Sequence, residues 1–436
     1  MHWLSSGIHD TYKGKCVVLI AKEWFFMAVP PIFKICMITL TSAMLVAPSA
    51  GVAADETDSS AVQRKAAELA MQRGLDWLAS LQQESGAWSN TNFPALTAMP
   101  LTAMVRSGRE DLVPNMQRAT DFLLSCAKTS GPDKGAIYQQ VDGRRGGGLS
   151  NYNTALSLLA LHAVQESPLL GEEQIPNLVP TILDARAFLA SSQYLGETVH
   201  YGGMGYDPPT ERSYADLSNA YLGYEAIRIT EDVEELRPGG ARVDLNWQAA
   251  TRFIERIQNL PDVNDQPWAT DHPDEVGGFT YRADVYRDDF GAFIDEDGVE
   301  RHRSALTMSY AGLLSYLYAG VSRDDKRVQA AKAWIQNNWN PEIPNRNPEL
   351  TGTDAQMGGF FYYLKVMSRT LDVYGNDTLR LTDGSEINWR NEIISTIVSH
   401  QNDDGFWLNE YGRYWEADPV LSTAYALLAL QNALGL

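Results

Sequence analysis

The strongest constraint on the fold of this chain is a series of helical segments that are far more apolar than their neighbours. They lie near residues 95–105, 151–164, 217–229, 306–319, 360–374 and 421–434. Each follows a segment with the pattern of an amphipathic helix, and these segments lie near residues 67–78, 116–127, 182–193, 247–258, 327–339 and 389–401. A helix that is apolar on every side must be enclosed by other parts of the protein. The chain is therefore expected to bury one helix of each pair behind the other.

The first pair shows the pattern clearly. Ala67, Met71, Leu75 and Leu78 recur at helical spacing with polar residues between them, as expected of a helix buried on one side. Two concentric barrels enclose six apolar helices, whereas an open solenoid would leave half of each in water. The amphipathic segments recur every ~45 to 80 residues, which does not fit the shorter ankyrin or tetratricopeptide repeats. The sequence predicts an all-α fold, an (α/α)6 toroid of six outer and six inner helices.

Residues 1–54 have the composition of an export signal. Lys34 is followed by an apolar run over residues 35–46 and then by small residues. We predict cleavage before Asp55, which leaves a toroid domain over residues 55–436.

Two alternatives concern this leader. Met27 is a second candidate for the first residue, and residues 35–54 are long enough to form an uncleaved membrane anchor. Pro48 and the small residues that end the segment favour cleavage. We therefore expect the domain to be periplasmic or secreted.

The net charge argues against several classes of partner. The whole chain carries a net charge of −20 at pH 7, and the leader contributes +2, from four lysines against Asp10 and Glu23, so the mature part carries −22. An excess of that size repels phosphate backbones and anionic lipid. We expect no nucleic-acid partner, and a membrane enters only as a source of substrate.

Two loops, in the first and last helix pairs, share a spacing of glutamine, glycine and tryptophan. Both fit the pattern Q-x-x-x-G-x-W, over residues 82–88 and 401–407. Stretched versions over residues 193–206 and 258–281 end in tyrosine instead of tryptophan. The glycine permits a left-handed turn, the aromatic ring can fold back onto the helix, and the glutamine can bridge backbone groups at helix ends. The motif is therefore structural.

This motif resembles the repeat of squalene and oxidosqualene cyclases, which protein prenyltransferase β-subunits share in weaker form. The resemblance covers essentially all of residues 55–436 and implies the same toroid. In those cyclases the initiating acid is an Asp-x-Asp-Asp run directly before Thr-Ala at the start of an inner helix. The matching positions here are 150–153 and 419–422, and neither contains a carboxylate. Since carbon protonation needs a clustered, water-shielded acid, we do not expect protonation-driven cyclisation of squalene.

The related prenyltransferases hold zinc with Asp, Cys and His near the inner barrel. Cys126 is the one cysteine that the mature chain keeps, because Cys16 and Cys36 lie in the leader, so no internal disulfide is possible. It ends an outer helix between apolar residues, which predicts a core residue and not a ligand. His162 is interpreted as a core or helix-end residue, and the histidines show no metal spacing. We expect no metal and no cofactor.

Candidate site residues follow from position. In such a toroid the inner helices run parallel and point their N-termini at one mouth of the barrel, so polar residues ahead of them can meet in a cavity. The candidate catalytic residues are Asp216 and Asp418, which directly precede inner helices. The candidate ligand-binding residues are Tyr206, Asp207, Tyr281, Arg282, Tyr310, Trp415 and Tyr425.

These residue types suggest chemistry and also a structural alternative. Aromatic rings stabilise a cation or stack on a sugar, and adjacent carboxylates act as acid and base. The alternative is that the rings fill a narrow barrel axis while Asp216 and Asp418 cap helices.

Two loops complete the candidate features. Residues 144–148 form a basic, glycine-rich turn ahead of a helix, which fits either an anion site or a solvated loop. Residues 261–303 form a long insertion rich in acidic and aromatic side chains, which we interpret as a lid across the barrel mouth.

Together these features predict a cavity that binds or transforms an apolar, polyprenyl-like small molecule. Two other classes stay open from the sequence. One is a carbohydrate-active toroid, a polysaccharide lyase or a glycosidase, and the other is a binding module without catalysis. The shape of the cavity separates them, because a closed apolar chamber suits a terpenoid, an open groove with carboxylates suits a sugar, and a filled axis suits a structural role.

Overall fold

The computed structural model describes residues 52–141, 148–170, 175–210 and 214–436. The compact unit begins at Val52, so nearly all of the predicted leader lies outside the described residues. None of the helices in these ranges is both long enough and apolar enough to cross a bilayer.

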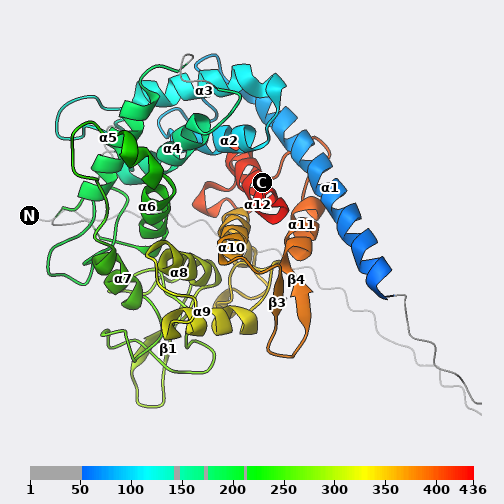
Figure 1. Cartoon of the computed structure of the whole chain (residues 1–436). Helices are drawn as coiled ribbons and strands as arrows, with labels where there is room; N and C mark the ends of the chain where they lie inside the picture. Colours follow the sequence, from blue (N-terminus) through cyan, green and yellow to red (C-terminus); the bar gives the residue numbers. More distant parts are fainter. Residues whose placement is uncertain (1–51, 142–147, 171–174, 211–213) are drawn as a thin grey trace, which may run out of the picture. The chain divides into compact units, whose positions relative to one another are not determined.

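Alternate helices along the chain have different surroundings. The odd-numbered helices are α1 (Val52–Leu81), α3 (Val113–Cys126), α5 (Leu178–Ser191), α7 (Trp247–Glu255), α9 (Lys326–Asn337) and α11 (Trp389–Ser399). The even-numbered helices are α2 (Ala95–Arg106), α4 (Ser150–Gln165), α6 (Leu217–Ile229), α8 (Leu306–Tyr318), α10 (Phe360–Tyr374) and α12 (Pro419–Leu434). Each even-numbered helix packs against the next even-numbered helix, and α12 packs against α2. The even-numbered helices therefore close a ring, and the odd-numbered helices lie around it (Figure 1). The prediction of an all-α toroid is confirmed.

The helices with few charged residues are buried most completely. In α12, which has no charged side chain, every residue from Val420 to Ala433 is buried. In α7 the buried residues are Ala249, Ala250, Phe253 and Ile254, which form one stripe. A helix without charges is thus enclosed, and an amphipathic helix covers it on one side.

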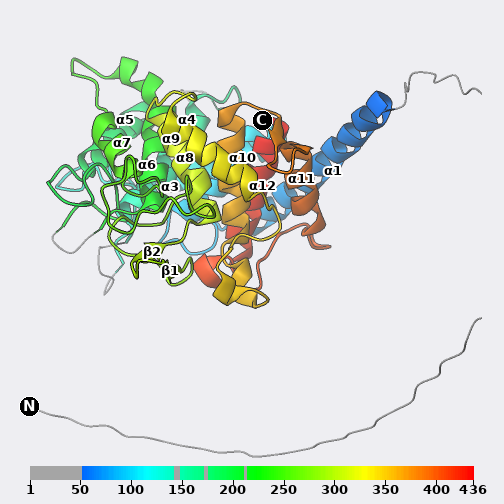
Figure 2. The same ribbon diagram turned by 90° about the horizontal axis from the view of Figure 1, so that it is seen from below.

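Two short antiparallel hairpins interrupt the helices. β1 (Ala292–Ile294) pairs with β2 (Glu300–His302), and β3 (Thr378–Arg380) pairs with β4 (Glu386–Asn388). Figure 2 shows the first hairpin and several long loops gathered at one end of the helices. The insertion predicted over residues 261–303 contains this hairpin.

The first glutamine loop ties α1 to α3 through backbone groups. Gln82 Nε2 donates to the carbonyl oxygens of Gly86 and Asn115, both at 2.9 Å. Gly86 has a φ of +87° and lies so close to α3 that a Cβ there would clash with its backbone. The ring of Trp88 is fully buried, and its Nε1 donates to Leu78 O at 2.7 Å. The ring therefore folds back onto the helix that precedes the loop.

The last glutamine loop repeats this arrangement and helps to close the ring. Gln401 Nε2 donates to Gly405 O at 2.7 Å and to Ala70 O at 2.8 Å. Trp407 is fully buried, and its Nε1 donates to Ile397 O at 2.8 Å. Because Ala70 belongs to α1, these bonds join the C-terminal helix pair to the N-terminal one.

The register of the two stretched loops corrects one prediction. Gly202 takes the left-handed conformation of the glycine in the first loop, and Met204, two positions later, is buried where the first loop buries its tryptophan. Phe279 holds the same position in the next loop. The residues that replace tryptophan are therefore Met204 and Phe279. Tyr206 and Tyr281 come two positions later and are free of that packing role.

Two further features of the sequence can be placed. Cys126 is buried at the end of α3, and its Sγ accepts a hydrogen bond from Gln139 Nε2 at 3.2 Å. The prediction that it is a core residue is confirmed. Of the basic turn predicted over residues 144–148, residues 144–147 lie outside the described residues.

Candidate functional site

A cavity of about 910 Å³ lies where the even-numbered helices begin. Each of these helices contributes to its wall, with Leu96 from α2, Tyr152 from α4, Ser218 from α6, Met308 from α8, Tyr362 from α10 and Tyr425 from α12. Loops supply the rest, including Tyr206, Tyr281, Arg287 and Trp415. The ring thus brings residues that are far apart in the sequence to one site.

Tyrosines form much of the cavity wall. The hydroxyls of Tyr152 and Tyr425 are 3.3 Å apart, and Tyr362 OH lies 2.8 Å from Ser218 Oγ. The ring centroids of Tyr362 and Tyr425 are 5.6 Å apart. Burial raises the pKa of Tyr152, so its hydroxyl stays protonated at neutral pH. The wall therefore offers neutral hydroxyls beside aromatic and aliphatic surface.

Two charged residues occur among the described residues that line the cavity, and Asp207 is the acidic one. Its Oδ1 accepts hydrogen bonds from Ser150 N at 2.7 Å and from Ser150 Oγ at 2.9 Å. Ser150 is the first residue of α4, where a carboxylate satisfies a free N–H group and meets the positive end of the helix dipole. Helix capping therefore accounts for the position of this charge.

The basic lining residue, Arg287, belongs to a group that we call the Arg287 cluster: Arg287, Asp289, Arg413 and Tyr414. Arg287 Nη2 donates to Asp289 Oδ2 at 2.8 Å, and its guanidinium lies 4.6 Å from the ring centroid of Tyr281. Asp289 Oδ2 also accepts from Arg413 Nη2 at 2.7 Å and from Tyr414 OH at 2.6 Å. Burial alone would raise the pKa of Asp289, but the bonds from Tyr414 and Arg413 lower it. Two guanidinium groups and one carboxylate leave a net charge of +1.

The loop before α12 holds two aromatic residues in a strained backbone. Tyr414 and Trp415 have φ values of 59° and 70°, in the left-handed region that favours glycine. Trp415 is 45% exposed and meets the ring of Phe93 edge-on, with centroids 4.7 Å apart. A left-handed conformation costs an L-residue about 1–2 kcal/mol, and such strain clusters at binding sites. The loop thus fixes an exposed indole at the cavity.

Five of the nine predicted site residues line the cavity: Tyr206, Asp207, Tyr281, Trp415 and Tyr425. The other four are not among its described lining residues: Asp216, Asp418, Arg282 and Tyr310. A position just ahead of an even-numbered helix therefore predicts only in part which residues line the cavity.

Asp216 was expected to face the cavity, and this expectation is corrected. It is fully buried and caps α6, with Oδ1 accepting from Asn219 N at 2.9 Å. Burial raises its pKa to about 6, although hydrogen bonds from Asn219 and Tyr281 act in the opposite direction. Burial and the nearby charge of Asp216 raise the pKa of both Tyr281 and Tyr206, and both tyrosines line the cavity. A buried carboxyl group therefore stands behind two hydroxyls of the wall.

Asp418 is likewise a helix cap. Its Oδ1 accepts from Val420 N at 2.9 Å in the first turn of α12, and its Oδ2 accepts a hydrogen bond from the hydroxyl of Ser89. Both bonds draw the carboxylate onto backbone and loop groups. The capping alternative therefore describes its position.

The last two predicted residues pack within the wall instead of lining it. Arg282 lies 3.8 Å from the ring centroid of Tyr214 and pairs with Asp284 at 2.6 Å. Tyr310 is fully buried in α8 and meets Tyr363 edge-on, with centroids 5.9 Å apart. Their side chains are engaged by neighbours in the protein.

Three of the lining residues that were not predicted from the sequence bear on the chemistry of the cavity: Tyr152, Tyr362 and Arg287. Tyr152 and Tyr362 lie in the first turn of α4 and α10, so the positional rule that selected Tyr425 applied to them as well. Arg287 belongs to the insertion over residues 261–303, and nothing in the local pattern distinguishes it from other arginines. The insertion does form part of the cavity wall.

A second buried carboxyl group, Glu416, lies next to the strained loop. Its Oε1 accepts from Tyr362 N at 2.7 Å at the start of α10, and its Oε2 accepts from Asn409 Nδ2 at 2.7 Å. Burial raises the pKa of Glu416 to about 7. It caps the helix and is not among the described lining residues.

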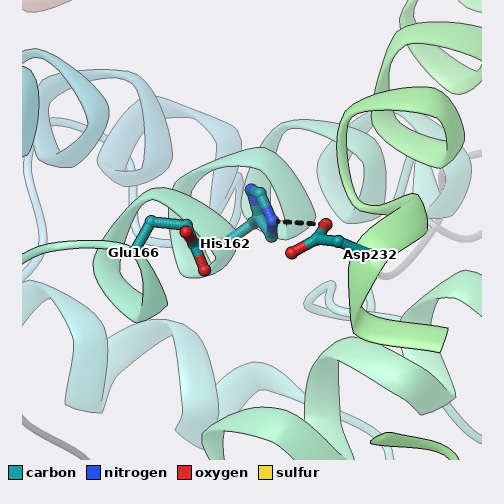
Figure 3. Close-up of side chains that lie close together, drawn as sticks. All are labelled: His162, Glu166 and Asp232. Atoms are coloured by element: carbon teal, nitrogen blue, oxygen red, sulfur yellow. Dashed lines mark hydrogen bonds and ion pairs between the residues drawn. The ribbon is translucent and has the colours of Figure 1, made fainter. Parts of the chain in front are cut away.

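Away from the cavity, three side chains with metal-ligand chemistry lie together near the C-terminal end of α4 (Figure 3). His162 and Glu166 stand one helical turn apart, and Asp232 comes from η3 (Glu231–Leu236). His162 Nε2 lies 3.0 Å from Asp232 Oδ1, and one ligand atom of each residue lies within 4.8 Å of the others. The full group is not visible as a spacing in the sequence, because Asp232 is 70 positions from His162 in the chain.

Comparisons with known proteins bear on the fold. The sequence matches no protein-family model and no curated protein. The structure is similar to the apo form of the type II terpene cyclase MstE from Scytonema, at 12% identity and a TM-score of 0.50, over 86% of this chain and 99% of that one.

Two other solved structures are similar at lower TM-scores. A GH76 α-mannanase from Bacteroides thetaiotaomicron has 13% identity and a TM-score of 0.49, over 84% of this chain and 95% of that one. A protein geranylgeranyltransferase-I from Candida albicans has 15% identity and a TM-score of 0.41, over 78% and 84%. At such identities the similarity to MstE shows the fold alone, a toroid of the terpenoid cyclase type.

Proposed function

We propose that this protein binds an elongated, mainly apolar small molecule of the isoprenoid type in the cavity. The observation that carries the proposal is the composition of the wall. Among its described lining residues only Asp207 and Arg287 are charged, and the others are aromatic, aliphatic or neutral. The volume of about 910 Å³ lies near the upper end of the roughly 300–1,000 Å³ typical of small-molecule sites, which suits a long ligand.

The aliphatic part of the wall favours a hydrocarbon over a sugar. Leu96, Met99, Met308 and Leu421 present side chains without hydrogen-bonding groups. Burial of apolar ligand surface there contributes about 25 cal/mol per Å². Sugar hydroxyls placed against these chains would lose water without gaining partners. A terpene cyclase uses a toroid of the same type, so the fold is compatible with such a ligand but does not specify it.

The Arg287 cluster would receive the polar end of the ligand. It carries a net charge of +1, and Arg287 itself lines the cavity. An anionic head group would gain charge-assisted hydrogen bonds there. The tail would then extend along the tyrosine and aliphatic wall.

Any chemistry on this ligand would depend on Asp216. A carboxyl group with a pKa of about 6 is partly protonated near neutral pH, and Tyr281 and Tyr206 connect it to the cavity. Such a group suits proton exchange with a ligand oxygen, whereas protonation of a carbon needs a stronger acid. Squalene cyclisation is therefore not part of the proposal.

The second candidate is a carbohydrate-active toroid, which the Arg287 cluster favours because an arginine beside tyrosine hydroxyls suits an acidic sugar. The glycosidase form is less well supported. Asp207 is the single carboxylate among the described lining residues, whereas glycosidases use a pair about 5 to 9.5 Å apart.

We also propose that the domain acts outside the cytoplasm, on the basis of the leader sequence. The basis is the apolar run over residues 35–46 that follows Lys34. N-terminal sequencing of the protein recovered from expressing cells should begin at Asp55. A soluble cytoplasmic species that begins at Met1 or Met27 would contradict export.

A binding experiment separates the two candidate functions. Geranylgeraniol, geranylgeranyl monophosphate and tetragalacturonate are titrated calorimetrically into the purified protein. We expect both isoprenoids to bind, the monophosphate more tightly because of the Arg287 cluster. Preference for tetragalacturonate would favour the carbohydrate candidate, and no binding of any probe at about 100 µM would contradict both.

A variant that fills the cavity locates the binding. Met99→Trp places an indole in the cavity and should weaken geranylgeraniol binding about tenfold or more. Val62→Trp is the matched control, because Val62 is exposed on α1 and lies outside the cavity. Equal affinities in the two variants would show that the ligand binds elsewhere. Thermal midpoints of both variants show whether either change disturbs folding.

A further inference from the structure

We propose that His162, Glu166 and Asp232 form a site for one divalent transition-metal ion of the zinc class. The site joins two separate segments, the C-terminal end of α4 and η3, which follows α6. Figure 3 shows the imidazole of His162 between the two carboxylates. The proposal is independent of the ligand of the large cavity.

The distances suit such an ion. Zinc bonds to nitrogen and oxygen ligands are about 2.0–2.2 Å long, which places two ligand atoms of a tetrahedral site roughly 3.3 Å apart. His162 Nε2 and Asp232 Oδ1 are 3.0 Å apart, so an ion can enter between them with little movement. Glu166 is exposed and has three rotatable side-chain bonds, and its carboxylate starts within 4.8 Å of the other two ligand atoms. Rotation of this side chain completes the set.

The charges of the group also favour a cation. Within the described part of the chain, neither Glu166 nor Asp232 pairs with a lysine or an arginine. Glu231, the neighbour of Asp232, pairs with both Arg228 and Arg242. The arginines near the group therefore neutralise Glu231 and not the carboxylates of Glu166 and Asp232. One divalent ion would offset both charges. An imidazole with two carboxylates favours Zn²⁺, Co²⁺ or Mn²⁺ over Ca²⁺, which takes six to eight oxygen ligands.

The position indicates a structural role for the ion. Tyr152 lines the cavity on α4, and His162 lies ten residues further along that helix, which is about 15 Å at 1.5 Å per residue. An ion there would be far from the cavity but would link the end of α4 to the segment after α6. These are neighbouring helices of the ring. Three protein ligands leave at least one coordination position to water.

Metal titration of the whole, untagged protein tests the site after treatment with EDTA and removal of the chelator. We expect about one equivalent of Zn²⁺ to bind near neutral pH, and Co²⁺ to give the visible absorption of a low-coordinate site. Saturating Zn²⁺ should raise the thermal midpoint, because it binds the folded state. Asp232→Asn and Glu166→Gln should each weaken Zn²⁺ binding about tenfold or more, since each removes an anionic ligand while keeping its shape.

The matched control is Glu235→Gln, which neutralises an exposed carboxylate of the same η3 outside the group. It should bind Zn²⁺ as tightly as the unsubstituted protein does. Both test substitutions are at exposed carboxylates and leave the buried imidazole in place, so their thermal midpoints without metal should match that of the control. Absence of Zn²⁺ binding to the unsubstituted protein at about 100 µM would overturn the proposal. Binding that is equally tight in all three variants would overturn it as well.

Discussion

The two ends of the even-numbered helices are built differently, although the same helices form both. Where the helices begin, their side chains leave a cavity with a largely uncharged wall. Towards the end where they finish, Glu225 of α6, Tyr318 of α8 and Arg369 of α10 meet in a polar cluster. The helices thus contribute an ionic cluster at one end and line a largely uncharged cavity at the other.

We call the polar group at this second end the Glu225 cluster: Glu225, Tyr318, Lys365 and Arg369. Glu225 Oε1 accepts from Arg369 Nε and from Tyr318 OH, both at 2.8 Å. Lys365 Nζ lies 3.9 Å from Glu225 and donates to Tyr221 OH at 2.7 Å. Burial alone would raise the pKa of Glu225, but the cations of Lys365 and Arg369 lower it. The ionised group therefore links α6, α8 and α10 at the end away from the cavity.

Removal of the central charge should give the largest effect. Glu225→Gln removes the carboxylate that pairs with the buried Lys365 and the partly buried Arg369, so the free energy of unfolding should fall by about 3–5 kcal/mol in urea denaturation. Asp289→Asn is the matched change at the cavity end, where the carboxylate side chain is 18% exposed against 6% for Glu225. It should cost about 1–2 kcal/mol. Equal losses in the two variants would remove the contrast between the ends.

A second pair of variants compares buried and exposed tryptophan at the cavity end. Trp407→Ala deletes a fully buried ring and should lower the free energy of unfolding by about 3–5 kcal/mol. Trp415→Ala removes an indole that is 45% exposed, and should cost less than about 1 kcal/mol while it weakens geranylgeraniol binding. Calorimetric titration and urea denaturation of both variants give the two readouts. An unchanged thermal midpoint for Trp407→Ala would show that the glutamine loop does not support the ring.

The pH dependence of stability should reveal the buried acid behind the cavity wall. Burial raises the pKa of Asp216 to about 6, whereas an aspartate in the unfolded chain titrates near 3.9. The folded state therefore holds the proton more tightly, and the contribution of Asp216 to the free energy of unfolding falls as the pH rises from about 4 to about 6. A shift of two units corresponds to ~3 kcal/mol.

Asp216→Asn keeps the cap of α6 but cannot titrate. The free energy of unfolding of the unsubstituted protein minus that of this variant should therefore fall by about 2–3 kcal/mol from pH 4 to pH 7. Urea denaturation at several pH values measures the difference. Parallel curves for the two proteins would show that the proton is not held at Asp216.

The helices of both ends were predictable because their signals are local. The apolar pattern of residues 217–229 predicted the segment that forms α6 with the same bounds. The stretched glutamine loops were predicted less well, since two candidate side chains follow each glycine. The hydrogen bonds and burial of the folded loop were needed to place Met204 in the core and Tyr206 two positions beyond it.

The cavity was predicted in part, and the misses have a physical cause. The rule that residues ahead of ring helices face one mouth identified Trp415 and Tyr425. It could not separate a side chain that lines the cavity from one that caps a helix, since Asp216 and Asp418 satisfy the same rule and bond to backbone instead. The Arg287 cluster joins two loops 124 residues apart, and such pairings follow from the fold and not from a local pattern.

The smallest predicted effect concerns the strain at the cavity end. Trp415→Gly and Trp415→Ala both remove the indole, but alanine keeps a Cβ at a φ of 70°. The left-handed conformation costs an L-residue about 1–2 kcal/mol, and the greater freedom of glycine in the unfolded chain returns about 0.5–1 kcal/mol of this. The glycine variant should therefore be more stable than the alanine variant by roughly 0.5–1 kcal/mol in urea denaturation. Both should lose the same geranylgeraniol affinity, because both lack the ring. Equal stabilities would show that the loop is relaxed, whereas the expected difference would mean that the cavity end gives up stability to hold an indole in place.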